Sequence, residues 1–148
     1  MVELLLQSVE PGRNVADARQ VYRQASYLEC VWTGKTLAQK FDVDHAIPFS
    51  LRHDNSLWNL FPADPKKNNA KRDKLPESKL VLQRKDAILT YWELLKAEIP
   101  GRFTSDYIRI TGEERLPEST WHTDLFSVFM EVIETTAATR GTPRWNGA

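Results

Sequence analysis

The residues between positions 41 and 76 limit the possible fold of this chain more than any other part of its sequence. A β-prone run at the start of this stretch ends in a carboxylate beside an imidazole, Asp44 and His45. Further along, Asp64 and Pro65 form a strong helix start, because aspartate caps a first turn well and proline suits the first helical position. The stretch therefore predicts a strand that delivers two polar side chains at its end, and a helix that follows it.

The residues around this strand predict a β-hairpin. Cys30–Trp32 is a short β-prone run, Thr33–Lys35 is a turn signal, and Phe41–His45 is the expected return strand. The connection from Ala46 to Ala63 is rich in apolar residues, so we expect an Ω-like loop that packs onto the hairpin. With a helix over about Pro65–Asp73, these elements predict a ββα unit.

Helical patterns flank this unit on both sides. Apolar residues at helical spacing predict amphipathic helices over about 15–28, 79–99 and 119–139. Residues 103–110 fit either irregular structure or a short helix, and residues 141–145 fit a tail. A bare ββα unit is too small to bury a core. We therefore expect one α+β domain over 1–148, in which a ββα core of about 30–76 is embedded in mostly helical structure.

Positive charge is concentrated in two places although the chain as a whole is neutral. Twenty basic and twenty acidic residues cancel, but five cations lie close together in and after the predicted helix: Lys66, Lys67, Lys71, Arg72 and Lys74. A second basic group, Arg13, Arg19 and Arg23, falls on the polar face of the first predicted helix. That face either touches a nucleic-acid backbone or is simply solvated.

Composition excludes several protein classes. A hydrophobic content of 41% and a charged content of 27% are ordinary for a globular domain and argue against disorder. The single cysteine, Cys30, excludes an internal disulfide and a CxxC zinc ribbon. The first residues do not resemble a signal peptide, and no apolar run approaches the ~20 residues of a membrane span. We expect a soluble, cytoplasmic protein.

The side chains of the central stretch suit hydrolysis of a phosphodiester on a metal ion. A metal lowers the pKa of bound water and neutralises charge on the phosphate. A histidine near its ordinary pKa can accept a proton at neutral pH. Asn68 and Asn69 supply amides downstream, and Lys66 and Lys67 supply charge that we expect to contact phosphate.

The ordered residues of this stretch also resemble the motif of the HNH nucleases, the ββα-metal family. The motif residues are Asp44-His45, Pro48, Ser50, Asn59, Asn68 and Lys71. Their succession is especially similar to the HNH domain of RNA-guided CRISPR nucleases, and the similarity covers about a quarter of the chain.

The resemblance implies a role for each motif residue. His45 would be the general base that activates water, and Asn59 would brace the loop and so orient it. Asp44 and Asn68 would bind one Mg²⁺, with Mn²⁺ as a possible substitute, although Asn69 remains an alternative to Asn68. Lys71 would lie near the phosphate or the leaving group, and Arg72 would join the DNA-binding cations. Many family members carry two zinc-binding cysteine pairs, which this chain lacks, so we expect no zinc.

These inferences predict a metal-dependent endonuclease that hydrolyses DNA and nicks it as a monomer. A first alternative is the catalytic module of a larger defence or restriction effector, because a chain of zero net charge has little electrostatic attraction to DNA. A second is a non-catalytic nucleic-acid-binding domain with an HNH-like fold. The sequence leaves open whether the substrate is DNA or RNA, and whether it is single- or double-stranded.

Overall fold

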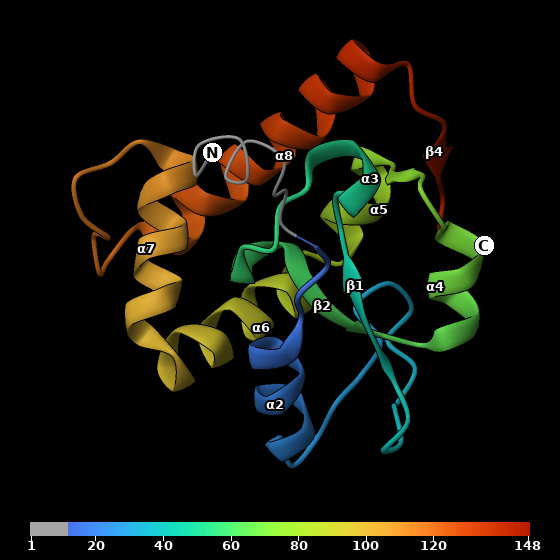
Figure 1. Cartoon of the computed structure of the whole chain (residues 1–148), viewed down its shortest axis with the longest axis horizontal. Coiled ribbons are helices and arrows are strands. Elements are labelled where there is room, and N and C mark those ends of the chain that lie inside the picture. Colours follow the sequence, from blue (N-terminus) through green and yellow to red (C-terminus); the bar gives the residue numbers. More distant parts are fainter. Residues whose placement is uncertain (1–11) are drawn as a thin grey trace, which may run out of the picture.

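The computed structural model describes residues 12–148, which form an α+β domain with mostly helical structure around a small ββα unit (Figure 1). In chain order the elements are α2 (Ala16–Gln24), β1 (Asp42–His45), α3 (Phe49–Arg52), the 3₁₀ turn η1 (Leu57–Asn59), β2 (Leu60–Ala63), α4 (Pro65–Lys71), β3 (Leu75–Pro76), α5 (Ser78–Gln83), α6 (Lys85–Glu98), α7 (Pro100–Thr111), α8 (Trp121–Arg140) and β4 (Arg144–Trp145). The expectation that the first residues are no signal peptide lies outside the described residues.

The hairpin of the ββα unit differs from the predicted one. β1 pairs antiparallel with β2, which follows it, and not with Cys30–Trp32, which precedes it. Cys30–Trp32 forms a turn instead, and Val31 donates a backbone hydrogen bond of 2.9 Å to Pro62 O in β2. All four residues of β2 are buried, so its sequence shows no polar alternation, and its proline argues against a strand. These two features made β2 look like part of a packed loop.

The start of α4 agrees with its sequence signals. Asp64 is the N-cap and accepts a bond of 3.4 Å from Lys67 N, and Pro65 occupies the first turn. The helix ends at Lys71, two residues earlier than expected, because Arg72 adopts a positive φ of 51°. This compact geometry places α4 directly beside β1.

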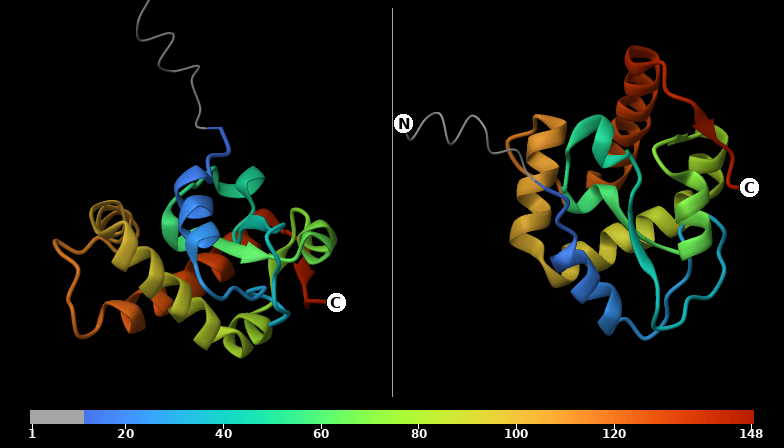
Figure 2. Two further views of the ribbon diagram at one scale, coloured as in Figure 1. Left: turned by 90° about the horizontal axis from the view of Figure 1, so that it is seen from below. Right: turned by 45° about the vertical axis from the view of Figure 1, so that its right-hand side comes forward.

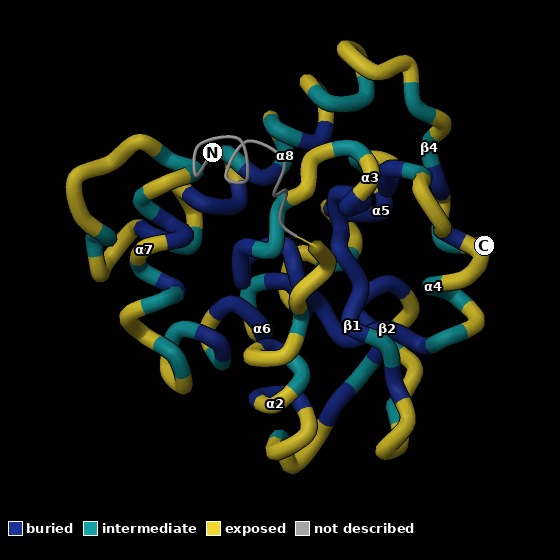
Figure 3. Tube along the Cα trace, in the orientation of Figure 1, coloured by how far each residue is buried: buried dark blue, intermediate teal, exposed yellow. Residues whose placement is uncertain are grey.

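Helices behind the hairpin supply its core. Figure 2 shows α6 and α8 on one side of the hairpin, with α2 on the other, and Figure 3 shows that both strands run through the buried centre. An aromatic cluster joins the layers: Phe61 of β2 and Trp92 of α6 both pack against Phe129 of α8. Trp92 Nε1 also donates to Trp58 O at 2.9 Å. The ββα unit is thus stabilised by helices that follow it in sequence.

The remaining helices differ in detail from their predictions. The helix expected over 79–99 is two helices, α5 and α6, which meet at Arg84. Residues 103–110, which fitted either irregular structure or a short helix, belong to α7. Pro100 lies in the first turn of α7, so this proline begins α7 as well as following the end of α6. The expected tail contains β4, which pairs parallel with β3. Within residues 12–148 no helix is long and apolar enough to cross a membrane.

Candidate active site

β1 and α4 border a hollow of about 560 Å³ that gathers four of the eight predicted site residues. Asp44 and His45 reach it from β1, and Asn68 and Arg72 reach it from α4 and its C-terminal end. Arg13, from the segment before α2, lines it as well. Asn69 and Asp73 line it too, so two carboxylates, an imidazole, two amides and two guanidinium groups share one hollow.

Asp44 is held at the base of this hollow by two side chains. Trp32 Nε1 donates to Oδ2 at 2.8 Å, and Lys71 Nζ lies 3.4 Å from Oδ1 and 3.3 Å from Oδ2. Asp44 is only 5% exposed, so these contacts fix its orientation. Because each carboxylate oxygen can accept two hydrogen bonds, Oδ1 keeps a lone pair that is free to bind a cation.

Lys71 occupies a different place from the one that the motif implied. Its side chain is fully buried, and its Nζ donates to His45 O at 3.0 Å as well as to Asp44. Burial lowers the pKa of Lys71, and the neighbouring Asp44 opposes that shift. With no exposed surface, the ammonium group of Lys71 is not accessible to a phosphate. The expectation of a phosphate contact is therefore corrected: the ammonium group neutralises Asp44 from within the core.

His45 is oriented by a residue that the motif did not include. Its Nε2 lies 2.9 Å from Asn55 Oδ1. The amide of Asn55 is itself fixed, because its Nδ2 donates to Gly12 O at 2.8 Å and its Oδ1 accepts from Asn14 N at 3.0 Å. Since Oδ1 can only accept, His45 Nε2 must carry the hydrogen, and the neutral ring keeps its lone pair on Nδ1.

The surroundings of His45 favour its neutral form. Burial lowers the pKa of the imidazole below its usual 6.5, and the positive charges of Arg13 and Lys71 act in the same direction. The hydrogen bond to Asn55 and the charge of Asp44 oppose this shift without reversing it. A histidine with a lowered pKa is ready to accept a proton at neutral pH.

Asn59, the middle residue of the motif, braces the loop between the strands. Its Nδ2 donates to Ile47 O and Asp54 O, both at 3.1 Å, and its Oδ1 accepts from Ile47 N at 2.8 Å. It is completely buried and lies outside the hollow. Asn59 therefore holds both ends of the loop in place, whereas the direct contact with His45 is made by Asn55.

Asn68 is tied to β1 in a way that frees its oxygen. Its Nδ2 donates to Asp42 Oδ2 at 2.9 Å, so the amide nitrogen is occupied and the acceptor Oδ1 remains available to a cation. Between residues 12 and 148 the structure brings together no group of three or more His, Cys, Asp or Glu that could hold a metal ion. Asp44 and Asn68 instead offer one carboxylate and one amide oxygen, a donor set that fits a hard cation which keeps several waters, such as Mg²⁺.

The predicted phosphate-binding cations are divided between two places. Arg72 is exposed and lines the hollow. Lys66 is exposed and Lys67 half-buried in the first turn of α4, and neither lines the hollow. Arg72 and Arg13 are thus the cations that share the hollow with the candidate base.

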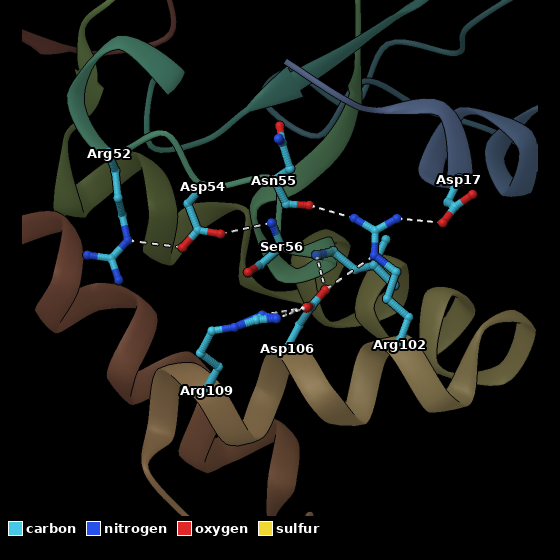
Figure 4. Close-up of polar contacts among 9 residues, drawn as sticks. Asp17, Arg52, Asp54, Asn55, Ser56, Arg102, Asp106 and Arg109 are labelled. Atoms are coloured by element: carbon cyan, nitrogen blue, oxygen red, sulfur yellow. Dashed lines mark hydrogen bonds and ion pairs between the residues drawn. The ribbon is translucent and has the colours of Figure 1, made fainter. Parts of the chain in front are cut away.

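A network from α2 and α7 supports the loop that carries Asn55 (Figure 4). Arg102 Nη2 donates to Asn55 O at 2.8 Å, and its Nη1 pairs with Asp17 Oδ2 at 2.6 Å. Asp106 Oδ2 accepts from Leu57 N at 2.8 Å, and Arg109 pairs with its Oδ1 at 2.7 Å. Burial raises the pKa of Asp106, although these partners oppose the shift. The loop backbone is therefore fixed from outside the ββα unit.

The fold and the side chains of this site agree with a known family. Residues 30–77 match the HNH endonuclease family model. The match covers about a third of the chain and includes both strands and α4. No curated protein and no solved structure gives a match to the chain. HNH nucleases are generally dependent on a divalent metal and act on nucleic acid, which agrees with the donor set of the hollow.

Three residues of this candidate site were not assigned from the sequence. Asp42 had a signal, since it shares a strand face with Asp44 by alternation. Trp32 and Asn55 had none, because their contacts depend on how the 30–32 turn and the loop after α3 fold back onto β1. Motif spacing identifies the groups that meet in the hollow, but it does not identify the groups that orient them.

Proposed function

We propose that this chain is a divalent-metal-dependent endonuclease that hydrolyses DNA, with His45 as its general base. The observation that carries the proposal is the contact between His45 Nε2 and Asn55 Oδ1, because it leaves Nδ1 as a free base beside Asp44. Asp44 and Asn68 would hold the metal, with Mg²⁺ as the ion that suits their oxygens best. When bound, the metal would lower the pKa of water and offset charge on the phosphate.

The protein's own groups account for the movement of protons and charge. His45 Nδ1 takes a proton from the attacking water, whose oxygen forms the new bond to phosphorus. The imidazolium that results is stabilised because Nε2–H donates to Asn55 and because Asp44 lies nearby. Positioned base catalysis of this kind typically contributes ~10²–10⁴-fold to a rate.

The reacting phosphate would meet positive charge on two sides. Arg13 and Arg72 line the hollow with His45, so their guanidinium groups suit the non-bridging oxygens. As the water oxygen bonds to phosphorus, the bond to the 3′ oxygen breaks and solvent supplies its proton. The products are a 5′-phosphate and a 3′-hydroxyl. One such site cuts one strand, so a monomer nicks a duplex.

A supercoiled plasmid tests this proposal. Wild-type protein should convert it to the nicked form with Mg²⁺ or Mn²⁺ and not with EDTA. His45→Ala should lose almost all nicking, whereas His122→Ala, which removes a histidine on α8 outside the hollow, should not. Unchanged nicking by His45→Ala would remove His45 from the mechanism.

The balanced charge of the chain favours one narrower form of the same proposal. Twenty basic and twenty acidic residues give the isolated chain little overall attraction to DNA. The domain would then serve as the cutting module of a larger defence or restriction effector, whose partner supplies specificity. Weak, sequence-independent nicking by the chain alone is the result expected for such a module, and strong site-specific cutting would contradict it.

A further inference from the structure

A second hollow lies between α2 and the residues that lead into β1. It has a volume of about 380 Å³ and is lined by Arg19, Arg23, Lys40 and Asp42 among others. Asp42 also receives the hydrogen bond from Asn68, a residue that lines the first hollow. α2 lies beside the start of β1 in the views of Figures 1 and 2. The hydrogen bond between Asn68 and Asp42 therefore links the linings of the two hollows.

The second hollow has an excess of positive charge. Arg19, Arg23 and Lys40 form no ion pair with any other residue between positions 12 and 148. Asp17 pairs with Arg102, and Asp42 is the one acid that lines this hollow, so the three cations leave an excess of two positive charges there. Arg19 and Arg23 lie one helical turn apart on the same face of α2. In a chain of zero net charge, this face is a local cationic surface.

An exposed aromatic ring lies at the far end of this surface. A third hollow, of about 530 Å³, shares Arg23, Gln39 and Phe41 with the second hollow and is also lined by Tyr27. Tyr27 is 62% exposed, and only Leu82 joins it as an exposed large hydrophobic residue between positions 12 and 148. An exposed ring beside cations is the combination that binds single-stranded nucleic acid, through stacking and phosphate contacts.

We propose that these residues form a track for a single DNA strand that extends from the active site. Arg19, Arg23 and Lys40 contact successive phosphates of the strand, and Tyr27 stacks on an unpaired base beyond them. The inference rests on the proposed nuclease function for the identity of the ligand. It adds a binding surface that is mainly outside the residues matched by the HNH family model.

Salt-dependent binding tests the phosphate contacts. The probe is a fluorescein-labelled single-stranded oligodeoxynucleotide, and its anisotropy is measured in EDTA so that no cleavage occurs. Each phosphate contact contributes about 0.7 to the slope of log affinity against log salt for a single strand. Arg19→Gln/Arg23→Gln should therefore flatten the slope by about 1.4. The control Lys79→Gln/Arg115→Gln removes the same charge from two exposed sites outside the track and should leave the slope unchanged.

A second set of variants tests the stacking contact. Tyr27→Ala should weaken binding of the same oligonucleotide about 5- to 150-fold, and Tyr27→Phe, which keeps a ring, should restore it. Leu82→Ala is the matched control, since it removes an exposed apolar side chain elsewhere and should have no effect. Circular dichroism confirms that each variant is folded.

The outcomes separate this inference from the nuclease proposal. If wild-type protein nicks plasmid but the track variants keep the wild-type slope and affinity, the track is wrong and the nuclease function stands. If the slope and affinity change as expected but no nicking occurs with any divalent metal, the track stands and the nuclease function is wrong. A wild-type protein that binds no oligonucleotide would overturn the track outright.

Discussion

Replacing the buried ammonium of Lys71 should destabilise the fold more than any other charge removal near the site. Lys71→Met keeps most of the side-chain volume but leaves Asp44 in the core with Trp32 as its remaining partner, and it leaves His45 O without its donor. Removing one partner of a buried ion pair typically costs about 3–5 kcal/mol, because the other charge is left uncompensated. An exposed pair would cost about 0–1 kcal/mol. The full burial of Lys71 places it in the first class.

Urea denaturation followed by circular dichroism measures this cost. A loss of about 3–5 kcal/mol corresponds to a fall in Tm of roughly 6–20 °C for a chain of this size. The double variant Lys71→Met/Asp44→Asn removes both charges and should recover much of the loss, which a double-mutant cycle quantifies. Lys66→Met, on the exposed side of the same helix, is the control and should change stability by less than about 0.5 kcal/mol.

The opposite pattern would refute the reasoning. If Lys71→Met keeps wild-type stability but loses DNA binding, Lys71 acts at the phosphate, as its motif position implied, and not as the counter-charge of Asp44. If the double variant is no more stable than the single one, the two charges are not coupled.

Three other predictions concern the groups that line or orient the hollow. Asn55→Leu should slow nicking about 10- to 100-fold, since it removes a hydrogen bond to a group that becomes charged; wild-type rates would contradict this. The pH dependence of nicking should have its lower midpoint below 6.5, because burial lowers the pKa of His45 and keeps the imidazole neutral to lower pH. Asn55→Asp should raise that midpoint. A wild-type midpoint above 6.5 would contradict the role of His45 as the general base. Asn68→Ala should abolish metal-dependent nicking, whereas Asn69→Ala should lower the nicking rate by a modest factor, because Asn68 contacts Asp42 on β1. The reverse result would place the metal ligand one residue later in the sequence.

Local chemistry explains which parts of the fold were predictable. The strand ending in Asp44 and His45 followed from β-prone residues, and the start of α4 followed from Asp64 and Pro65. The pairing of β1 did not, because both candidate partners are short and the true one contains Pro62. Strand pairing is decided by burial against helices far along the chain, which periodicity within a short window does not report.

At the site, too, the residues that lie close together in the sequence were predictable, and contacts with distant parts of the chain were not. The groups that meet in the hollow lie on β1 and α4, so spacing from His45 was enough to place Asn68 there. The orientation of the imidazole depends on Asn55, and Asn55 depends on Gly12 before the motif and Arg102 after it. No spacing rule within residues 41–76 contains those contacts.

The parts of the chain outside the family match therefore have a definable role at the candidate site. Asp44 is oriented by Trp32, and the ring of Trp32 packs edge-on against Trp145 of β4 with their centroids 6.1 Å apart. His45 is oriented by Asn55, which Arg102 of α7 holds through its backbone. Each half of the site is thus supported by an element that the 30–77 segment lacks. In this chain, helices and the parallel pairing of β3 with β4 thus hold Asp44 and His45 in position.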